Sequence, residues 1–298
     1  MQCSKCRNMA VMFQEYSGQH LCRHHFDADV EAKAKHEIRR NHWINPGDHI
    51  AVALSGDAVS SALLYFLKKL VSNRRDIRIS AIVVDEGILG FHRLECARQI
   101  AEHLETECHI GSFRERFGKT LDDIIRTQDR TNTCTCCSLL RNFLLNQIAV
   151  GHGITKLAYG DTLDKGAVSV LKNILQGYPE ILVNREKGDR QGVLLIRPFL
   201  SVPRKEVIVY AGLHVKGYDQ SHCPYSDSPF DRDTRTMLDE FTVRHPATKY
   251  ALMSLEKNMA GSCSAMTESI SACRRCGEMY DGICQTCRII DEVTSHGT

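Results

Sequence analysis

The sequence predicts an α/β protein with a doubly wound parallel sheet and a small metal-binding module at each end. Short apolar segments rich in β-forming residues alternate with longer segments that have helical spacing. Cysteine pairs separated by two residues lie near both ends of the 298-residue chain. We divide the chain into four parts: an N-terminal zinc ribbon (1–30), a helical linker (31–47), the α/β domain with a third cysteine site (48–258), and a C-terminal zinc ribbon (259–298).

The α/β domain begins after a turn expected at Pro46-Gly47. Residues 49–55 form a short apolar run that predicts a buried parallel strand, and 58–70 have the leucine spacing of a helix. The free N–H groups at the start of such a helix can hold a phosphate. The alternation continues with strands expected in 77–87, 107–110 and 156–162, helices in 30–41, 91–104, 138–153 and 164–177, a strand–loop–helix unit in 194–213, and two helices divided at Pro246 in 231–259.

Three strand ends mark the expected binding crevice. Ligands of doubly wound sheets lie outside the carboxyl ends of the strands. We therefore expect Ser55, Asp85 and Gly160 to surround one crevice. The loop that carries the cysteines of the middle of the chain should reach the same edge.

Composition narrows the class of protein. Charged residues make up 25% and hydrophobic residues 43% of the chain, as in ordinary globular domains. No run of about 18 apolar residues predicts a membrane span, and residues 1–10 lack the apolar core of a signal peptide. We expect a cytoplasmic protein. The net charge of +2 selects no partner, and two local basic runs suit either a solvated surface or phosphate contacts: Lys33, Lys35, Arg39 and Arg40, and Arg274, Arg275 and Arg288.

The 14 cysteines favour metal sites over disulfides in a cytosolic chain. Each two-residue gap makes a tight knuckle that directs two ligands at one ion, and two knuckles complete a closed tetrahedral zinc site. Two such sets are present, one at each end: Cys3, Cys6, Cys22 and His25, and Cys273, Cys276, Cys284 and Cys287. Both are expected to be structural, because neither leaves an open coordination position.

A third group of cysteines has only three members with suitable spacing. Cys134 and Cys137 form a pair in the middle of the chain, and Cys223 precedes a proline. Cys136 is close enough to serve as a spare ligand. From the residues alone, an iron–sulfur cluster, a zinc site and a catalytic disulfide to Cys223 remain open.

Taken in order, these motifs resemble the TtcA/TtuA family of tRNA 2-thiolating enzymes, most closely the archaeal-type tRNA-uridine 2-sulfurtransferases. The resemblance runs nearly end to end. Besides the two ribbons it includes the phrase VVDEGILGF at 83–91, the Cys134–Cys137 pair followed by Arg141, and Cys223-Pro224-Tyr225.

The resemblance implies a PP-loop ATPase fold, like that of the adenine nucleotide α-hydrolases. It implies that ATP with Mg²⁺ adenylates the C2 oxygen of a tRNA uridine and that sulfur then replaces AMP. It implies a [4Fe–4S] cluster on three cysteines, a ubiquitin-like sulfur-carrier protein and a homodimer. The catalytic residues would be Cys134, Cys137, Arg141, Asp164 and Cys223, and the nucleotide site would include Ala53, Ser55, Gly56, Ser60, Val84, Arg141 and Gly160.

Two motifs depart from the family pattern. The phrase SGGxDS is here Ser55-Gly56-Asp57-Ala58-Val59-Ser60, with Asp57 for the second glycine and Val59 for the aspartate. The phrase GHNLDDEA is reduced to matches at Gly160, Leu163, Asp164 and Ala167, with Lys165 placed to offset phosphate charge. A carboxylate beside a pyrophosphate repels it, so we expect weaker nucleotide binding. The alternatives are an active sulfurtransferase, a non-adenylating paralogue that binds tRNA or a partner, and a cluster-dependent sulfur enzyme of altered substrate.

Overall fold

The computed structural model describes residues 1–91, 93–127, 133–178, 189–190, 193–225, 228–262, 273 and 283–295. The strands are β1 (Met12–Gln14), β2 (Gln19–Leu21), β3 (His49–Ala53), β4 (Arg78–Asp85), β5 (Glu107–Ser112), β6 (Lys156–Ala158), β7 (Asp189–Arg190) and β8 (Val193–Ile196). The helices are α1 (Arg23–Arg40), α2 (Ala58–Leu70), α3 (Arg93–His103), α4 (Phe113–Phe117), α5 (Leu121–Thr127), α6 (Thr133–Gly151), α7 (Leu163–Leu175), α9 (Arg204–His214), α10 (Pro229–Arg244), α11 (Thr248–Ser262) and α12 (Gln285–Ser295).

A central sheet has the strand order β5-β4-β3-β6-β8-β7. The first five strands in this order are parallel, and β7 is antiparallel to β8. The chain starts in the middle with β3, winds outward to β5, and then returns to add β6 on the other side of β3. This order confirms the predicted doubly wound fold and puts a switch point between β3 and β6.

Helices cover both faces of the sheet. Because side chains alternate along a strand, Ile50 and Val52 of β3 join the core cluster formed with α1, α2 and α9. Ala51 points to the other face, where it packs with Leu145 and Ala149 of α6. Both faces of β3 are therefore buried, which explains why its sequence is a continuous apolar run rather than an alternating one.

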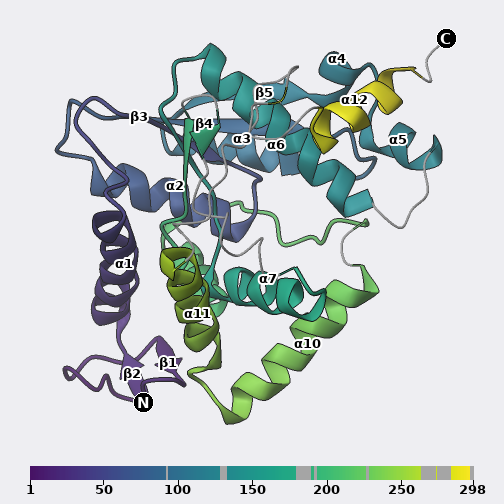
Figure 1. The fold of residues 1–298 in the computed structure, drawn as a ribbon. Helices are drawn as coiled ribbons and strands as arrows, with labels where there is room; N and C mark the ends of the chain where they lie inside the picture. The colour runs from purple at the N-terminus through teal and green to yellow at the C-terminus, as the bar shows by residue number, and fades with distance from the viewer. Residues whose placement is uncertain are drawn as a thin grey trace.

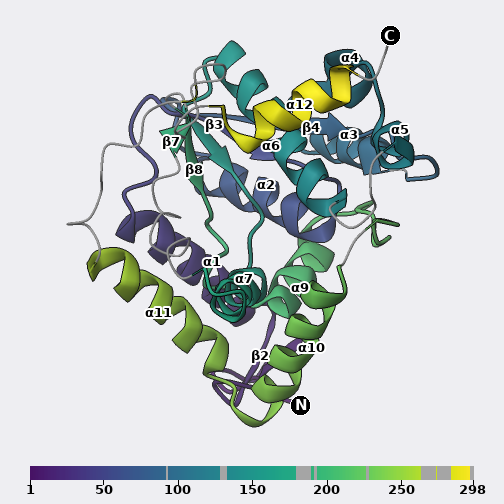
Figure 2. The same cartoon turned by 45° about the vertical axis from the view of Figure 1, so that its right-hand side comes forward.

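Smaller elements extend the domain at opposite ends. The β1–β2 hairpin and α1 lie at one end, while α12 lies at the other, against α6 (Figures 1 and 2). Helices α7, α10 and α11 pack together beside the sheet. Helix α10 ends at Arg244 and α11 begins at Thr248, on either side of Pro246 as predicted.

The structure corrects the prediction around the middle cysteines. We expected a loop there and a helix over 138–153, but α6 begins at Thr133 and includes both members of the cysteine pair. Cys134 and Cys137 are three residues apart, so they lie on the same face of its first turn. The short helices α4 and α5 and the edge strand β7 were not predicted.

Candidate functional site

A cavity of ≈ 480 Å³ lies at the carboxyl ends of the parallel strands. Ser55 after β3, Asp85 of β4 and Gly160 after β6 all line it, which confirms the expected crevice. Nine of the predicted cofactor and cluster residues lie in its wall: Ala53, Ser55, Ser60, Val84, Cys134, Cys137, Arg141, Gly160 and Cys223. The fold therefore unites the nucleotide motif and the three-cysteine motif.

Two elements bring the three cysteines to the cavity. Cys134 and Cys137 come from the first turn of α6, and Cys223 comes from the segment between α9 and α10. The Cys134 thiol donates to the carbonyl of Tyr225, 2.9 Å away, which ties the two elements together. Cys136 is not part of the cavity wall; it is buried in a hydrophobic cluster with Ile290 and Val293 of α12. The structure does not support its role as a spare ligand.

Burial determines the protonation state of two of these thiols, Cys137 and Cys223. It raises the pKa of Cys137 to about 12, and it raises the pKa of Cys223 as well. Such thiols ionise only when a cation takes the place of the proton. Three cysteines in the wall of one cavity, with no fourth among the described residues that line it, suit a metal cluster that takes its remaining ligand from elsewhere.

Arg141 lies one turn along α6 from Cys137. Its Nη1 is 3.3 Å from Oε1 of Glu86, which follows β4 and also lines the cavity. Burial raises the pKa of Glu86, and the positive charge of Arg141 opposes that shift. In the sequence, Glu86 is part of the motif at 83–91 and was not predicted as a site residue. Its place directly after the end of β4 is the signal that marks it as one.

The loop between β3 and α2 is closed by its own aspartate. The carboxylate Oδ1 of Asp57 accepts a hydrogen bond of 2.8 Å from the backbone N–H of Ser60, so Asp57 is the N-cap of α2. The Ser60 hydroxyl accepts from the N–H of Ser55 at 3.2 Å. Val59 is buried at 4% exposure. A phosphate at this helix start would compete with Asp57 for the Ser60 N–H group.

Gly56 supports the loop from outside the cavity wall. Its φ of +76° is left-handed, and a Cβ there would lie 2.6 Å from the carbonyl oxygen of Arg93. Only glycine fits both demands. We predicted Gly56 as a nucleotide-binding residue; the structure shows a contact with α3 and gives Gly56 no place in the cavity lining.

The cavity lining also carries two cations and one buried carboxylate. Asp161 Oδ1 is 2.6 Å from Nζ of Lys165, and its Oδ2 is 3.0 Å from Nε of Arg197. All three residues line the cavity. Lys165 is therefore present near the expected phosphate position, but its charge is shared with Asp161. Asp161 and Arg197 were not predicted as site residues, because Asp161 stands at a position where the family motif has histidine.

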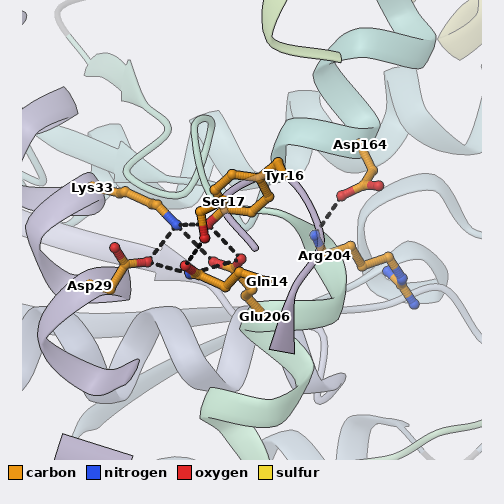
Figure 3. Close-up of polar contacts among 8 residues, drawn as sticks. All are labelled: Gln14, Tyr16, Ser17, Asp29, Lys33, Asp164, Arg204 and Glu206. Atoms are coloured by element: carbon orange, nitrogen blue, oxygen red, sulfur yellow. Dashed lines mark hydrogen bonds and ion pairs between the residues drawn. The ribbon is translucent and has the colours of Figure 1, made fainter. Parts of the chain in front are cut away.

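Asp164 lies outside the cavity lining. Its carboxylate accepts a hydrogen bond of 2.6 Å from Nζ of Lys249 on α11. It accepts another from the N–H of Arg204, which begins α9 (Figure 3). The expectation that Asp164 positions Mg²⁺ or the reacting base is not supported by this placement. It joins three helices instead.

The N-terminal ligand set is assembled as predicted. The ligand atoms of Cys3, Cys6, Cys22 and His25 lie within 4.8 Å of one another. Nδ1 of His25 is 3.4 Å from the sulfurs of Cys3 and Cys22. Although burial opposes the shift, hydrogen bonds from the backbone N–H groups of Cys22 and Lys5 lower the pKa of Cys3 to about 6. Four convergent donors, three of them cysteine, fit a closed zinc site.

The C-terminal set is seen in part. Cys273, Cys284 and Cys287 are buried with their sulfurs within 4.8 Å of one another. Backbone N–H groups of Cys284 and Cys287 donate to sulfur at 3.4 Å. The fourth predicted ligand, Cys276, lies outside the described residues. Zinc fits the three sulfurs in the same way as at the N-terminus.

Lys33, the first residue of the N-terminal basic run, has a structural role. Nζ of Lys33 is 2.6 Å from Asp29 and 2.9 Å from Glu206, which is 1% exposed on its side chain (Figure 3). Gln14 and Tyr16 of the N-terminal module also donate to Glu206, at 3.2 and 2.8 Å. This network fixes the N-terminal module to α9. Arg39 and Arg40 remain exposed, while Arg274 and Arg275 lie outside the described residues.

Two known protein families match this chain. A model described as "PP-loop domain" matches residues 26–232, and one described as "2-thiouridine synthetase TtuA, N-terminal LIM domain" matches 2–27. The first covers well over half of the chain, so this protein belongs to the PP-loop family. The fold and the cavity at the sheet edge agree with that membership.

The most informative relatives act on tRNA. The chain is 28% identical to "tRNA 2-thiolation protein NcsA" of Haloferax volcanii, over 98% of this chain and 99% of the relative. It is 29% identical to "Cytoplasmic tRNA 2-thiolation protein 1" of Mus musculus, over 97% and 72%. The solved "U34-tRNA thiolase NcsA from Methanococcus maripaludis with its [4Fe-4S] cluster" has a TM-score of 0.85 at 26% identity, covering 98% of this chain and 96% of that one. These matches confirm the predicted resemblance. In the part of the chain that the structure describes, no helix is both long and apolar enough to cross a membrane.

Proposed function

We propose that this protein is an enzyme of tRNA 2-thiolation, which transfers sulfur to C2 of a uridine. One observation carries the proposal: the PP-loop segment and three cysteines from distant parts of the chain line the same cavity. The near full-length similarity to tRNA 2-thiolation proteins supports it.

The chemistry explains why the two motifs share one cavity. The C2 oxygen of uridine is a poor leaving group. Transfer of an adenylyl group from ATP to that oxygen, with release of pyrophosphate, makes it a good one. A sulfur nucleophile then replaces AMP at C2. Because water would also attack the adenylated base, both steps require the same shielded space.

The cavity residues divide into two groups in this proposal. Ala53, Ser55, Ser60, Val84 and Gly160 form the nucleotide end, with Lys165 and Arg197 as the nearby cations. Cys134, Cys137 and Cys223 would hold a [4Fe–4S] cluster. When bound, such a cluster supplies an iron that the protein leaves unligated, which can accept an external sulfur ligand. Arg141 lies one turn along α6 from Cys137 and balances negative charge beside the thiolates.

Further parts of the proposal concern binding partners and location. The substrate is tRNA, a ubiquitin-like carrier protein delivers the sulfur, and the protein works in the cytoplasm as a homodimer. The two terminal modules hold one zinc ion each. Both are structural in this proposal, because a closed set of four ligands leaves no position for a substrate.

A second function is favoured by the loop between β3 and α2. Its helix start is capped by the Asp57 carboxylate, and Val59 stands where the family motif has aspartate. Both features favour a protein that keeps the cluster without adenylating its substrate, either as a tRNA-binding paralogue or as a sulfur enzyme that does not use ATP. Calorimetric titration with ATP and Mg²⁺ separates these functions, since no detectable binding would exclude the adenylating enzyme.

The decisive experiment examines tRNA from cells that lack the gene. Mass spectrometry of the nucleosides should show the loss of one 2-thiouridine, and its sequence context identifies the target. An unchanged nucleoside profile would contradict the proposal. In parallel, Cys223→Ala should remove iron and sulfide from anaerobically purified protein while both zinc ions remain. Loss of zinc instead would mean that Cys223 is not a cluster ligand.

A further inference from the structure

The segment that carries Cys223 is held by a side chain from another part of the chain. Arg93, the first residue of α3, places Nε 3.2 Å from Oδ2 of Asp219. The same guanidinium donates through Nη2 to the carbonyl oxygen of Ser221. Cys223 follows two residues later. The planar guanidinium of Arg93 therefore binds this segment at two points just before Cys223.

Asp219 organises the segment from within. Its Oδ1 accepts a hydrogen bond of 2.9 Å from the N–H of Ser221, and its Oδ2 accepts from the Ser221 hydroxyl. The side chains of Arg93 and Asp219 are 24% and 19% exposed, so the pair is partly shielded from solvent. Although burial opposes the shift, the bonds from Ser221 and Arg93 lower the pKa of Asp219 and keep it ionised.

The backbone of the same aspartate is attached to the nucleotide loop. Its N–H donates to the carbonyl of Gly56 at 2.8 Å, and Asp57 and Asp219 form an isolated parallel bridge. Gly56 in turn lies against the Arg93 backbone, where a Cβ would come within 2.6 Å of the carbonyl oxygen. Three segments far apart in the sequence therefore meet at Arg93: the loop after β3, the start of α3, and the segment before Cys223.

A positioning device is needed at Cys223 more than at the other two cysteines. Cys134 and Cys137 are fixed relative to each other by the helix that contains them. Cys223 lies in an irregular segment, and a multinuclear site requires all three sulfurs to converge within a fraction of an ångström. Arg93 lines the same cavity as Cys223, so its contacts act close to the site.

We infer that Arg93 and Asp219 are positioning residues, which set the place of Cys223 relative to the other cysteines and to the nucleotide loop. The inference rests on the proposed function in one respect, namely that Cys223 is the third cluster ligand. Neither residue ligates iron or touches the reacting atoms. Their effect acts on how firmly the cluster is held.

The test compares Arg93→Gln, Arg93→Lys and Asp219→Asn with the parent protein after anaerobic reconstitution with iron and sulfide. The measurement is the rate at which an iron chelator bleaches the cluster absorbance. Loss of the charge-assisted bonds should speed release about tenfold in Arg93→Gln. Arg93→Lys keeps the charge but not the fork of donors, so its rate should lie between the two. Arg98→Gln, an exposed arginine on the same helix, is the matched control and should behave like the parent.

Two measurements on the whole fold separate positioning of Cys223 from general weakening of the fold: a positioning role requires that Arg93→Gln speeds cluster release while both measurements stay at the values of the parent protein. Zinc content and the melting temperature, measured on every variant, report folding independently of the cluster. Equal release rates for Arg93→Gln and Arg98→Gln would overturn the inference. Absence of a cluster from the parent protein would instead contradict the proposed function.

Discussion

Asp57 makes the sharpest prediction about nucleotide use. Its carboxylate caps α2 through a 2.8 Å bond from the Ser60 N–H and places a negative charge close to the expected phosphate position. Replacing an aspartate N-cap by alanine costs about 1 kcal/mol of stability, by glycine only a few tenths, while asparagine caps about equally well. At an effective dielectric of 20, a charge about 6–8 Å from a phosphate contributes roughly 2–3 kcal/mol of repulsion before salt screening.

These magnitudes separate two effects of the substitution. Asp57→Asn keeps the cap and removes the charge, so it should tighten binding of ATP and Mg²⁺ about tenfold at unchanged stability. Asp57→Gly also frees the Ser60 N–H, so it should gain a further few-fold at a small cost in stability. Asp57→Ala should match the glycine variant in affinity but melt at a lower temperature.

Isothermal titration at two salt concentrations measures the affinity, and urea unfolding measures the stability. The gain of Asp57→Asn should shrink at high salt, because it comes from charge. If the parent and all three variants bind ATP equally, the helix start is not the phosphate site and the argument is refuted. Tight binding by the parent would refute it as well, since the capped loop should then bind weakly.

Four further predictions concern a buried ion pair, a left-handed glycine, a buried histidine and the N-terminal metal ligands. Lys33→Met should destabilise the fold by about 2–3 kcal/mol in urea unfolding, because it leaves the buried Glu206 without its cation. The control is Lys205→Met, which breaks an exposed pair with Glu15 and should leave stability unchanged. Equal losses of stability in the two variants would contradict the prediction. Gly56→Ala should cost about 2–3 kcal/mol from strain plus the clash with Arg93, whereas Gly153→Ala, with φ of +63° and open space, should cost only about 1 kcal/mol. Burial lowers the pKa of His49, so the unfolded chain binds more protons than the folded chain once the pH drops below about 6.5. The free energy of unfolding should be constant above that pH and fall as the pH drops below it. His49→Asn should make the free energy of unfolding less dependent on pH in this range. An unchanged pH dependence would show that His49 does not contribute to it. Removing zinc with a chelator should unfold the N-terminal module. Amide hydrogen exchange should then become faster over 1–25 while exchange in β3 and β4 stays slow. If the amides of 1–25 stay protected from exchange without metal, the module does not depend on zinc.

Motifs with short spacing were predictable from the sequence for local reasons. A two-residue gap between ligands that occurs twice near one end of the chain favours a pair of knuckles, so the N-terminal set was predictable before any fold was known. Strand ends followed by small or acidic residues indicated the crevice, because parallel strands all point their carboxyl ends to one edge. The alternation of segments predicted the sheet for the same reason.

The roles of particular charged residues were not predictable. Asp164 matched a family motif, yet it binds Lys249 and the Arg204 N–H away from the cavity. Lys33 belonged to a basic run, yet it neutralises Glu206, a residue 173 positions along the chain. A charge near a motif becomes a site residue only when the helix that carries it turns that face to the cavity, and the packing of distant helices decides this.

The sequence by itself determined the metal-ligand spacing, the order of strands and helices, and the loss of two phosphate-loop residues, since each depends on neighbours along the chain. Only the tertiary structure decided that Cys223 joins Cys134 and Cys137 in one cavity, and that Arg93 links the nucleotide loop to the cysteine segment. These depend on contacts between segments separated by tens of residues or more. Such contacts form because both faces of the sheet must be buried, and no local pattern specifies which side chains that burial brings together.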